Sequence, residues 1–203
     1  MLRDKLFNIN KFGHYRVMIS FLLSLCLASC VKDSNYAKYK VTAEKAINSG
    51  KRVDTLFFGL HLGMTTKEFY GHCWEMNKKG LFTDGEGNTT VLYRFRNNEF
   101  EHPVSMNFYP DFHNDKIYKM DVSYQYDAWA PWNKHLFADK LLLEVLEMYK
   151  KWYSNGTPFI KIEDKTRGTI YVKVDGNRRI IIGRYDDVKV KVDYTDLLIE
   201  EEI

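Results

Sequence analysis

The sequence predicts an α+β domain in which two main helices pack on one face of an antiparallel sheet. Several segments alternate apolar and polar residues with a period of two, which is typical of strands with one buried face. These segments span residues 104–108, 120–126, 170–174 and 188–194. Two further segments carry apolar residues at helical spacing. Asp175-Gly176, which separates two strand segments, is a strong hairpin signal. We therefore expect a meandering antiparallel sheet.

Residues 1–29 have the features of a secretory leader: basic residues followed by a short apolar run at 17–27. The run is too short to span a bilayer, which takes roughly 20 apolar residues. The quartet Leu27-Ala28-Ser29-Cys30 resembles the lipobox of bacterial lipoproteins. This resemblance implies diacylation of the Cys30 thiol, cleavage before Cys30, and attachment to the membrane through the lipid. An ordinarily secreted protein and a membrane-retained leader remain the alternatives.

Residues 30–53 are expected to form a lipidated tether, because they are rich in Lys, Asn, Ser and Ala and poor in large apolar side chains. At most a short helix is expected near residues 42–48. Val31 to Arg52 holds six basic residues against Asp33 and Glu44. Two interpretations are open: the basic side chains lie against anionic headgroups, or the segment is a solvated linker, which is the simpler explanation.

The charge of the chain gives no indication of a nucleic-acid partner. The leader holds four of the 30 Lys and Arg but one of the 27 Asp and Glu, which leaves 26 of each in the mature chain. The pI of about 8.6 therefore describes the precursor. Of the three cysteines, Cys26 leaves with the leader and Cys30 is expected to carry lipid, so Cys73 has no disulfide partner. Residues 54–203 are expected to form a single globular domain stabilised by its core.

The first helix is expected to open at Thr65, which forms a capping-box pattern with Glu68, and to stop near Gly80. Met64 and Phe69 occupy the positions of a hydrophobic staple. The Gly63-Met64-Thr65 helix opener resembles that of BamE/SmpA-type outer-membrane lipoproteins. That resemblance implies helices on a short antiparallel sheet and a role in the assembly of outer-membrane proteins. The second helix and the later strands depart from that smaller fold.

The second helix is expected from about Trp132 to Tyr153, with an apolar face opposite a charged one. Turns are expected at 111–115 and at Asp186-Asp187. The resulting order is a helix and three strands, followed by a helix and three or four strands. This order indicates a structural duplication, and the polar strand face is left for solvent or a partner.

Each candidate for catalysis or metal binding has a simpler structural explanation. His72 and Cys73 are neighbours on a helix, so their side chains point about 100° apart and cannot form a nucleophile and base by themselves. Asp84 to Asn88 spaces its oxygen ligands like a calcium loop but lacks the later glycine and glutamate. Asp111, His113 and Asp115 fit a polar turn as well as a metal site. We expect no catalytic residue, no metal and no cofactor.

Four aromatic residues have the greatest potential for binding a ligand: Tyr124, Tyr126, Trp129 and Trp132. Aromatic faces beside a few polar groups suit sugar rings or a protein hot spot. Core packing is the alternative, because Tyr124 and Tyr126 continue the apolar face of their strand.

Together these features predict a lipid-anchored protein of the bacterial cell envelope, at the outer membrane or facing the periplasm or the cell surface. Its domain is expected to be a non-enzymatic binding or scaffolding module that contacts another envelope component. A carbohydrate or small-ligand binder is the alternative, and a hydrolase comes third.

Overall fold

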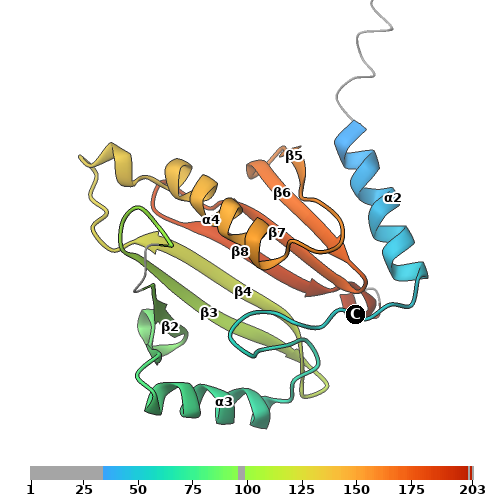
Figure 1. Cartoon of the computed structure of the whole chain (residues 1–203), viewed down its shortest axis with the longest axis horizontal. Coiled ribbons are helices and arrows are strands. Elements are labelled where there is room, and N and C mark those ends of the chain that lie inside the picture. The colour runs from blue at the N-terminus through green and yellow to red at the C-terminus, as the bar shows by residue number, and fades with distance from the viewer. Residues whose placement is uncertain (1–33, 96–98, 201, 203) are drawn as a thin grey trace, which may run out of the picture. The chain divides into compact units, whose positions relative to one another are not determined.

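The computed structural model describes residues 34–95, 99–200 and 202 (Figure 1). The predicted signal peptide and Cys30 lie outside these residues. The chain divides into two units, residues 1–38 and 39–203. Of the first unit the structure describes only the opening residues of helix α2 (Ser34–Asn48), and all that follows concerns the second unit. No helix in the described part of the chain is long and apolar enough to cross a membrane.

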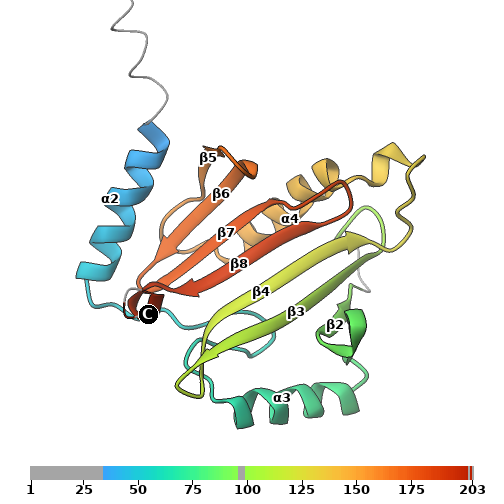
Figure 2. The same cartoon turned by 180° about the vertical axis from the view of Figure 1, so that it is seen from behind.

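The second unit is built on one antiparallel sheet of eight strands (Figures 1 and 2). The order across the sheet is β1-β2-β3-β4-β8-β7-β6-β5. The strands are β1 (Phe82–Asp84), β2 (Val91–Arg94), β3 (Val104–His113), β4 (Lys116–Tyr126), β5 (Ile160–Asp164), β6 (Gly168–Asp175), β7 (Arg178–Arg184) and β8 (Val190–Asp196). The α+β class and the antiparallel sheet are confirmed, and the sheet is larger than expected.

The turns follow their local sequence. The β6–β7 hairpin turns at Gly176, whose φ of 56° suits a tight two-residue loop. The segment 111–115 is a turn only at its end, because β3 continues to His113 across a register shift at Asp111 and Phe112. Asn114 and Asp115 make the tight turn with φ of 49° and 61°. Asn and Asp accept these left-handed conformations more readily than most residues.

Helix α3 (Thr66–Lys78) begins as predicted. The Thr65 hydroxyl accepts a hydrogen bond from the Glu68 N–H, and the Glu68 carboxylate accepts one from the Thr65 N–H at 2.8 Å. The hydrogen bond from the Thr65 N–H is also the main cause of the lowered pKa of Glu68. Met64 and Phe69 are both buried, as a hydrophobic staple requires. The helix ends just before Gly80 and packs against the edge strand β1.

Replacing Thr65 by Ala is expected to lower the free energy of unfolding by about 1 kcal/mol, because an orphan N–H at the start of α3 loses its acceptor. Urea unfolding of the full chain measures the change. Thr66→Ala is the matched control, because its neighbouring hydroxyl does not cap the helix. Equal losses in both variants would contradict the capping role.

Helix α4 (Ala138–Trp152) starts six residues later than expected. A short 3₁₀ helix, η3 (Lys134–Leu136), and an extended Phe137 precede it. The apolar stripe begins only at Ala138, and Trp132 lies outside it with 84% of its surface exposed. The predicted face of α4 is otherwise buried, and it packs on β4, β7 and β8.

A second apolar cluster lies on the face of the sheet opposite α4. Tyr171 packs toward the main core, so its neighbour Val172 in β6 points to the other side. There Tyr39, Ala43, Ala46 and Ile47 of α2 pack with this cluster, and so does Leu197 of α5 (Leu197–Glu200). The compact unit begins at Tyr39, so it includes residues that were expected to belong to the tether. These four α2 residues recur at helical spacing, which gives the helix a partly buried apolar stripe.

Candidate functional site: a polar groove on the central strands

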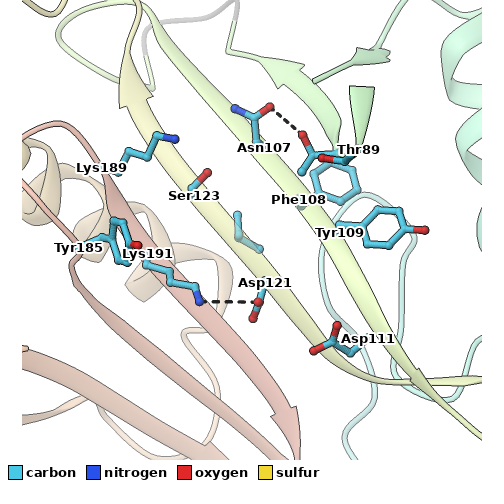
Figure 3. Close-up of a pocket in the computed structure, with 12 residues that line it drawn as sticks. Thr89, Asn107, Phe108, Tyr109, Asp111, Asp121, Ser123, Tyr185, Lys189 and Lys191 are labelled. Carbon is cyan, nitrogen blue, oxygen red and sulfur yellow. Dashed lines mark hydrogen bonds and ion pairs between the residues drawn. The ribbon is translucent and has the colours of Figure 1, made fainter. Parts of the chain in front are cut away.

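An open groove of about 520 Å³ lies on the polar face of the central strands (Figure 3). Strands β3, β4 and β8 form its floor. The β1–β2 loop contributes Thr89 and Thr90 on one side, and the β7–β8 loop contributes Tyr185 and Lys189 on the other. The floor residues are Asn107, Phe108, Tyr109, Asp111, Asp121, Val122, Ser123 and Lys191.

The alternation of the strands creates this polar floor. Along β3, Met106 and Phe108 point into the core, so Asn107 and Tyr109 point to the opposite face. The strand register then sets polar residues beside one another: Asn107 pairs with Ser123, Tyr109 with Asp121, and Ser123 with Lys191. The polar residues of three strands therefore meet at one place.

A row of alternating charges crosses the floor. Lys119 lies 3.5 Å from Asp111 and 3.3 Å from Asp121. Lys191 lies 3.6 Å from Asp121 and 3.3 Å from Asp193. Burial of the Lys119 ammonium opposes its charge, but the nearby carboxylates of Asp121, Asp111 and Asp193 together outweigh burial and raise the pKa of Lys119. Each carboxylate of the groove is therefore matched by an ammonium group.

An ion pair joins the two sides of the groove. Glu86 in the β1–β2 loop and Lys189 in the β7–β8 loop are 2.7 Å apart. Asn107 fixes the first loop from below, because its Oδ1 accepts hydrogen bonds from the Glu86 N–H and the Thr90 hydroxyl, both at 3.2 Å. A side chain at Gly85 would collide with these groups, so this position requires glycine. The loop is thus held in a defined position over the floor.

Tyr109 connects the groove to helix α3. Its hydroxyl is hydrogen-bonded to that of Tyr70, and this bond, aided by burial, raises the pKa of Tyr109 to about 12. Tyr70 and Trp74 line a neighbouring pocket of about 460 Å³, which also contains Cys73 and shares Thr90 with the groove. Burial raises the pKa of the Cys73 thiol to about 11, so the thiol stays protonated near neutral pH.

The four aromatic residues predicted to bind a ligand do not form a common exposed surface. Tyr124 and Tyr126 are buried core residues, and the Tyr124 hydroxyl lies 2.9 Å from that of Tyr149. Trp129 is half-buried against Phe137 and the core. Trp132 alone is exposed. The core-packing alternative is therefore correct for Tyr124 and Tyr126. Trp132, by contrast, lies outside the buried stripe of α4.

The residues considered for catalysis or metal binding have structural roles. His72 Nε2 lies 2.8 Å from the Phe58 carbonyl oxygen. This contact holds the imidazole ring against the segment 54–64. The predicted loop at 84–88 forms the end of β1 and the short helix η2 (Glu86–Asn88). Within residues 34–95, 99–200 and 202, no three His, Cys, Asp or Glu side chains are grouped to hold a metal ion.

The alternating segments predict a polar strand face that is open to solvent or a partner, but not which of its residues meet in the groove. Asn107, Asp121, Ser123 and Lys191 are polar members of those segments. Their convergence depends on β8 pairing with β4, which joins residues about 70 positions apart. The signal available in the sequence is the set of polar residues at the outward-facing positions of the strands.

Comparison of the chain with protein-family models, curated proteins and solved structures gives no match. The function of the groove is therefore argued from its own residues.

Proposed function

We propose that the chain is a lipid-anchored cell-envelope protein whose domain is a non-enzymatic binding module, with the groove as its ligand site. The observation that carries this proposal is the open polar groove itself, on the face of the sheet opposite α4. Binding sites in proteins are typically concave, with a few polar groups that fix the ligand's orientation. The lipobox-like quartet at Cys30 supports the envelope location.

The groove has the composition of a binding site rather than a catalytic one. Its lining contains no histidine and no cysteine. Ser123 is the only serine of the lining, and its cross-strand neighbour Lys191 is engaged by the carboxylates of Asp121 and Asp193. Nucleophilic catalysis needs a base within hydrogen-bond reach of the hydroxyl. A binding module accounts for the paired charges better than the hydrolase alternative.

The place of the groove also fits a duplicated domain with two main helices. Each of α3 and α4 is followed by four strands, and the last strands of the two halves, β4 and β8, are neighbours in the sheet. The groove lies over the junction of these two halves. A cleft between repeated units is a common location for a ligand site.

Photocross-linking in intact cells tests the proposal. A photoreactive residue replaces Tyr185 or Ser123 in the groove, and Leu143, which is 53% exposed on α4, is the control position. We expect both groove positions to give the same adduct and the control to give none. A Cys30→Ala variant should lose the adduct if the ligand is reached only from the membrane. Absence of an adduct at both groove positions, or the same adduct at Leu143, would contradict the proposal.

A further inference from the structure

The charges of the groove are balanced, so it carries no excess charge that would attract a strongly charged ligand. Among its lining residues Asp111 and Asp121 oppose Lys189 and Lys191, and each of the four already has an ionic partner. A phosphate or a polycation would have to compete with these pairs for its counter-charges. The electrostatics therefore favour a ligand that is polar but carries no formal charge.

The floor offers hydrogen-bond donors and acceptors in alternation. The Asp121 carboxylate and the Lys191 ammonium are 3.6 Å apart, so a single hydroxyl group can donate to the first and accept from the second. The Ser123 hydroxyl adds a group that does both. In Figure 3 the Asn107 amide nitrogen points toward the side of the groove where Ser123 and Lys189 lie. This pattern matches the closely spaced hydroxyl groups of a sugar.

The groove also has an exposed aromatic ring at its rim. Tyr185 is 71% exposed and lines the groove from the β7–β8 loop. An aromatic face of this kind can pack against the apolar C–H face of a pyranose ring. The volume of about 520 Å³ lies within the range of roughly 300–1,000 Å³ that is usual for ligand sites, and the open ends allow a chain to continue beyond it.

We infer that the groove binds an uncharged oligosaccharide, with Tyr185 stacking on one sugar ring and Asp121, Ser123 and Lys191 bonding its hydroxyl groups. This inference rests on the proposed function and names the ligand of the same site. A protein partner is less well matched, because protein hot spots are centred on desolvated aromatic and apolar anchors. Phe108 and Val122 line the floor but point into the core and are each only 1% exposed, so neither side chain can anchor a protein partner from the groove.

The test uses the full chain purified from membranes in detergent. It is applied to an array of neutral and acidic oligosaccharides, and the affinity for the best neutral glycan is then measured by calorimetry. We expect binding to at least one neutral oligosaccharide, weakened tenfold or more in Tyr185→Ala and nearly unchanged in Tyr185→Phe, which keeps the ring. Leu143→Ala and Trp132→Ala are exposed controls that should bind normally. Thermal unfolding shows that every variant is folded.

Three outcomes would overturn the inference: no neutral glycan is bound, only acidic glycans are bound, or Tyr185→Ala binds as tightly as the unchanged protein. The cross-linking experiment distinguishes failure of the oligosaccharide hypothesis from failure of the binding-module hypothesis. A protein adduct at Tyr185 and Ser123 with an empty glycan array would overturn the oligosaccharide and leave the binding module. An empty array without any groove adduct would overturn both.

Discussion

Asp175→Asn should destabilise the domain by about 3–5 kcal/mol, the usual cost of breaking a buried ion pair from one side. The Asp175 carboxylate lies 2.9 Å from the Lys173 ammonium and 3.4 Å from the Arg178 guanidinium. Both cationic side chains are almost fully buried, at 2% and 5% exposed. Asparagine keeps the shape of the side chain but removes the charge. Two buried cations would then face each other without their shared anion.

Urea unfolding of the full chain measures this change. Glu147→Gln is the matched control, because Glu147 pairs with Lys150 at 2.7 Å on the exposed side of α4. Exposed pairs of this kind contribute roughly 0–1 kcal/mol. A loss below about 1 kcal/mol in Asp175→Asn would show that backbone carbonyl groups compensate the two cations. The Asn155 carbonyl oxygen, 2.9 Å from the Lys173 ammonium, is one such group.

Alkaline unfolding is the second large effect expected. Four tyrosines are buried between α4 and the sheet, two from the end of α4 and one each from β4 and β8. The hydroxyls of Tyr124 and Tyr149 are 2.9 Å apart and those of Tyr153 and Tyr194 are 2.8 Å apart. Burial raises the pKa of all four, and that of Tyr153 reaches about 12 although the hydrogen bond to Tyr194 and the charge of Arg178 oppose the rise.

The direction in which stability changes with pH follows from the raised pKa values of the four tyrosines. The folded state holds its tyrosine protons above pH 10, where the unfolded chain begins to release them. Stability is therefore fully present below about pH 10 and is lost as the pH rises toward 12. At 1.36 kcal/mol for each pH unit, Tyr153 alone accounts for a loss of roughly 2–3 kcal/mol by pH 12, and the other three add to it.

Circular dichroism and tyrosinate absorbance, followed together from pH 9 to 12, measure this transition. We expect the exposed tyrosines to ionise first and the buried ones to ionise together as the fold is lost. Tyr149→Phe should flatten the dependence of stability on pH, while Tyr185→Phe, at an exposed position, should leave it unchanged. A fold that survives to pH 12 with all its tyrosines ionised would contradict this account.

The sequence predicted the elements that depend on local patterns. The start of α3 at Thr65 needs only the capping box, and β3, β4, β6 and β8 follow from the alternation at residues 104–108, 120–126, 170–174 and 188–194. Strand β7 contains the unbroken apolar run Ile180 to Ile182, which does not alternate, and β1 and β2 have only three and four residues. The positions of β1 and β2 are set by pairing with longer neighbours.

The groove and the role of α2 depend on contacts between distant parts of the chain. The seam between β4 and β8 brings Ser123 next to Lys191, and no local pattern reports that register. For α2, the composition of a linker concealed a partly buried stripe, half of whose members are the small residues Ala43 and Ala46. Small side chains give a weak amphipathic signal even when they are packed.

The position of β8 in the sheet also determines when the fold can be completed during synthesis. Although β8 (Val190–Asp196) is the last strand of the chain, it occupies the middle of the sheet between β4 and β7. A ribosome delivers the N-terminal part first. Until residue 196 has emerged, β4 and β7 are two unpaired edges, and exposed edges of this kind promote aggregation. The same long-range closure that creates the groove therefore makes a nascent chain of this protein dependent on protection until its final strand is in place.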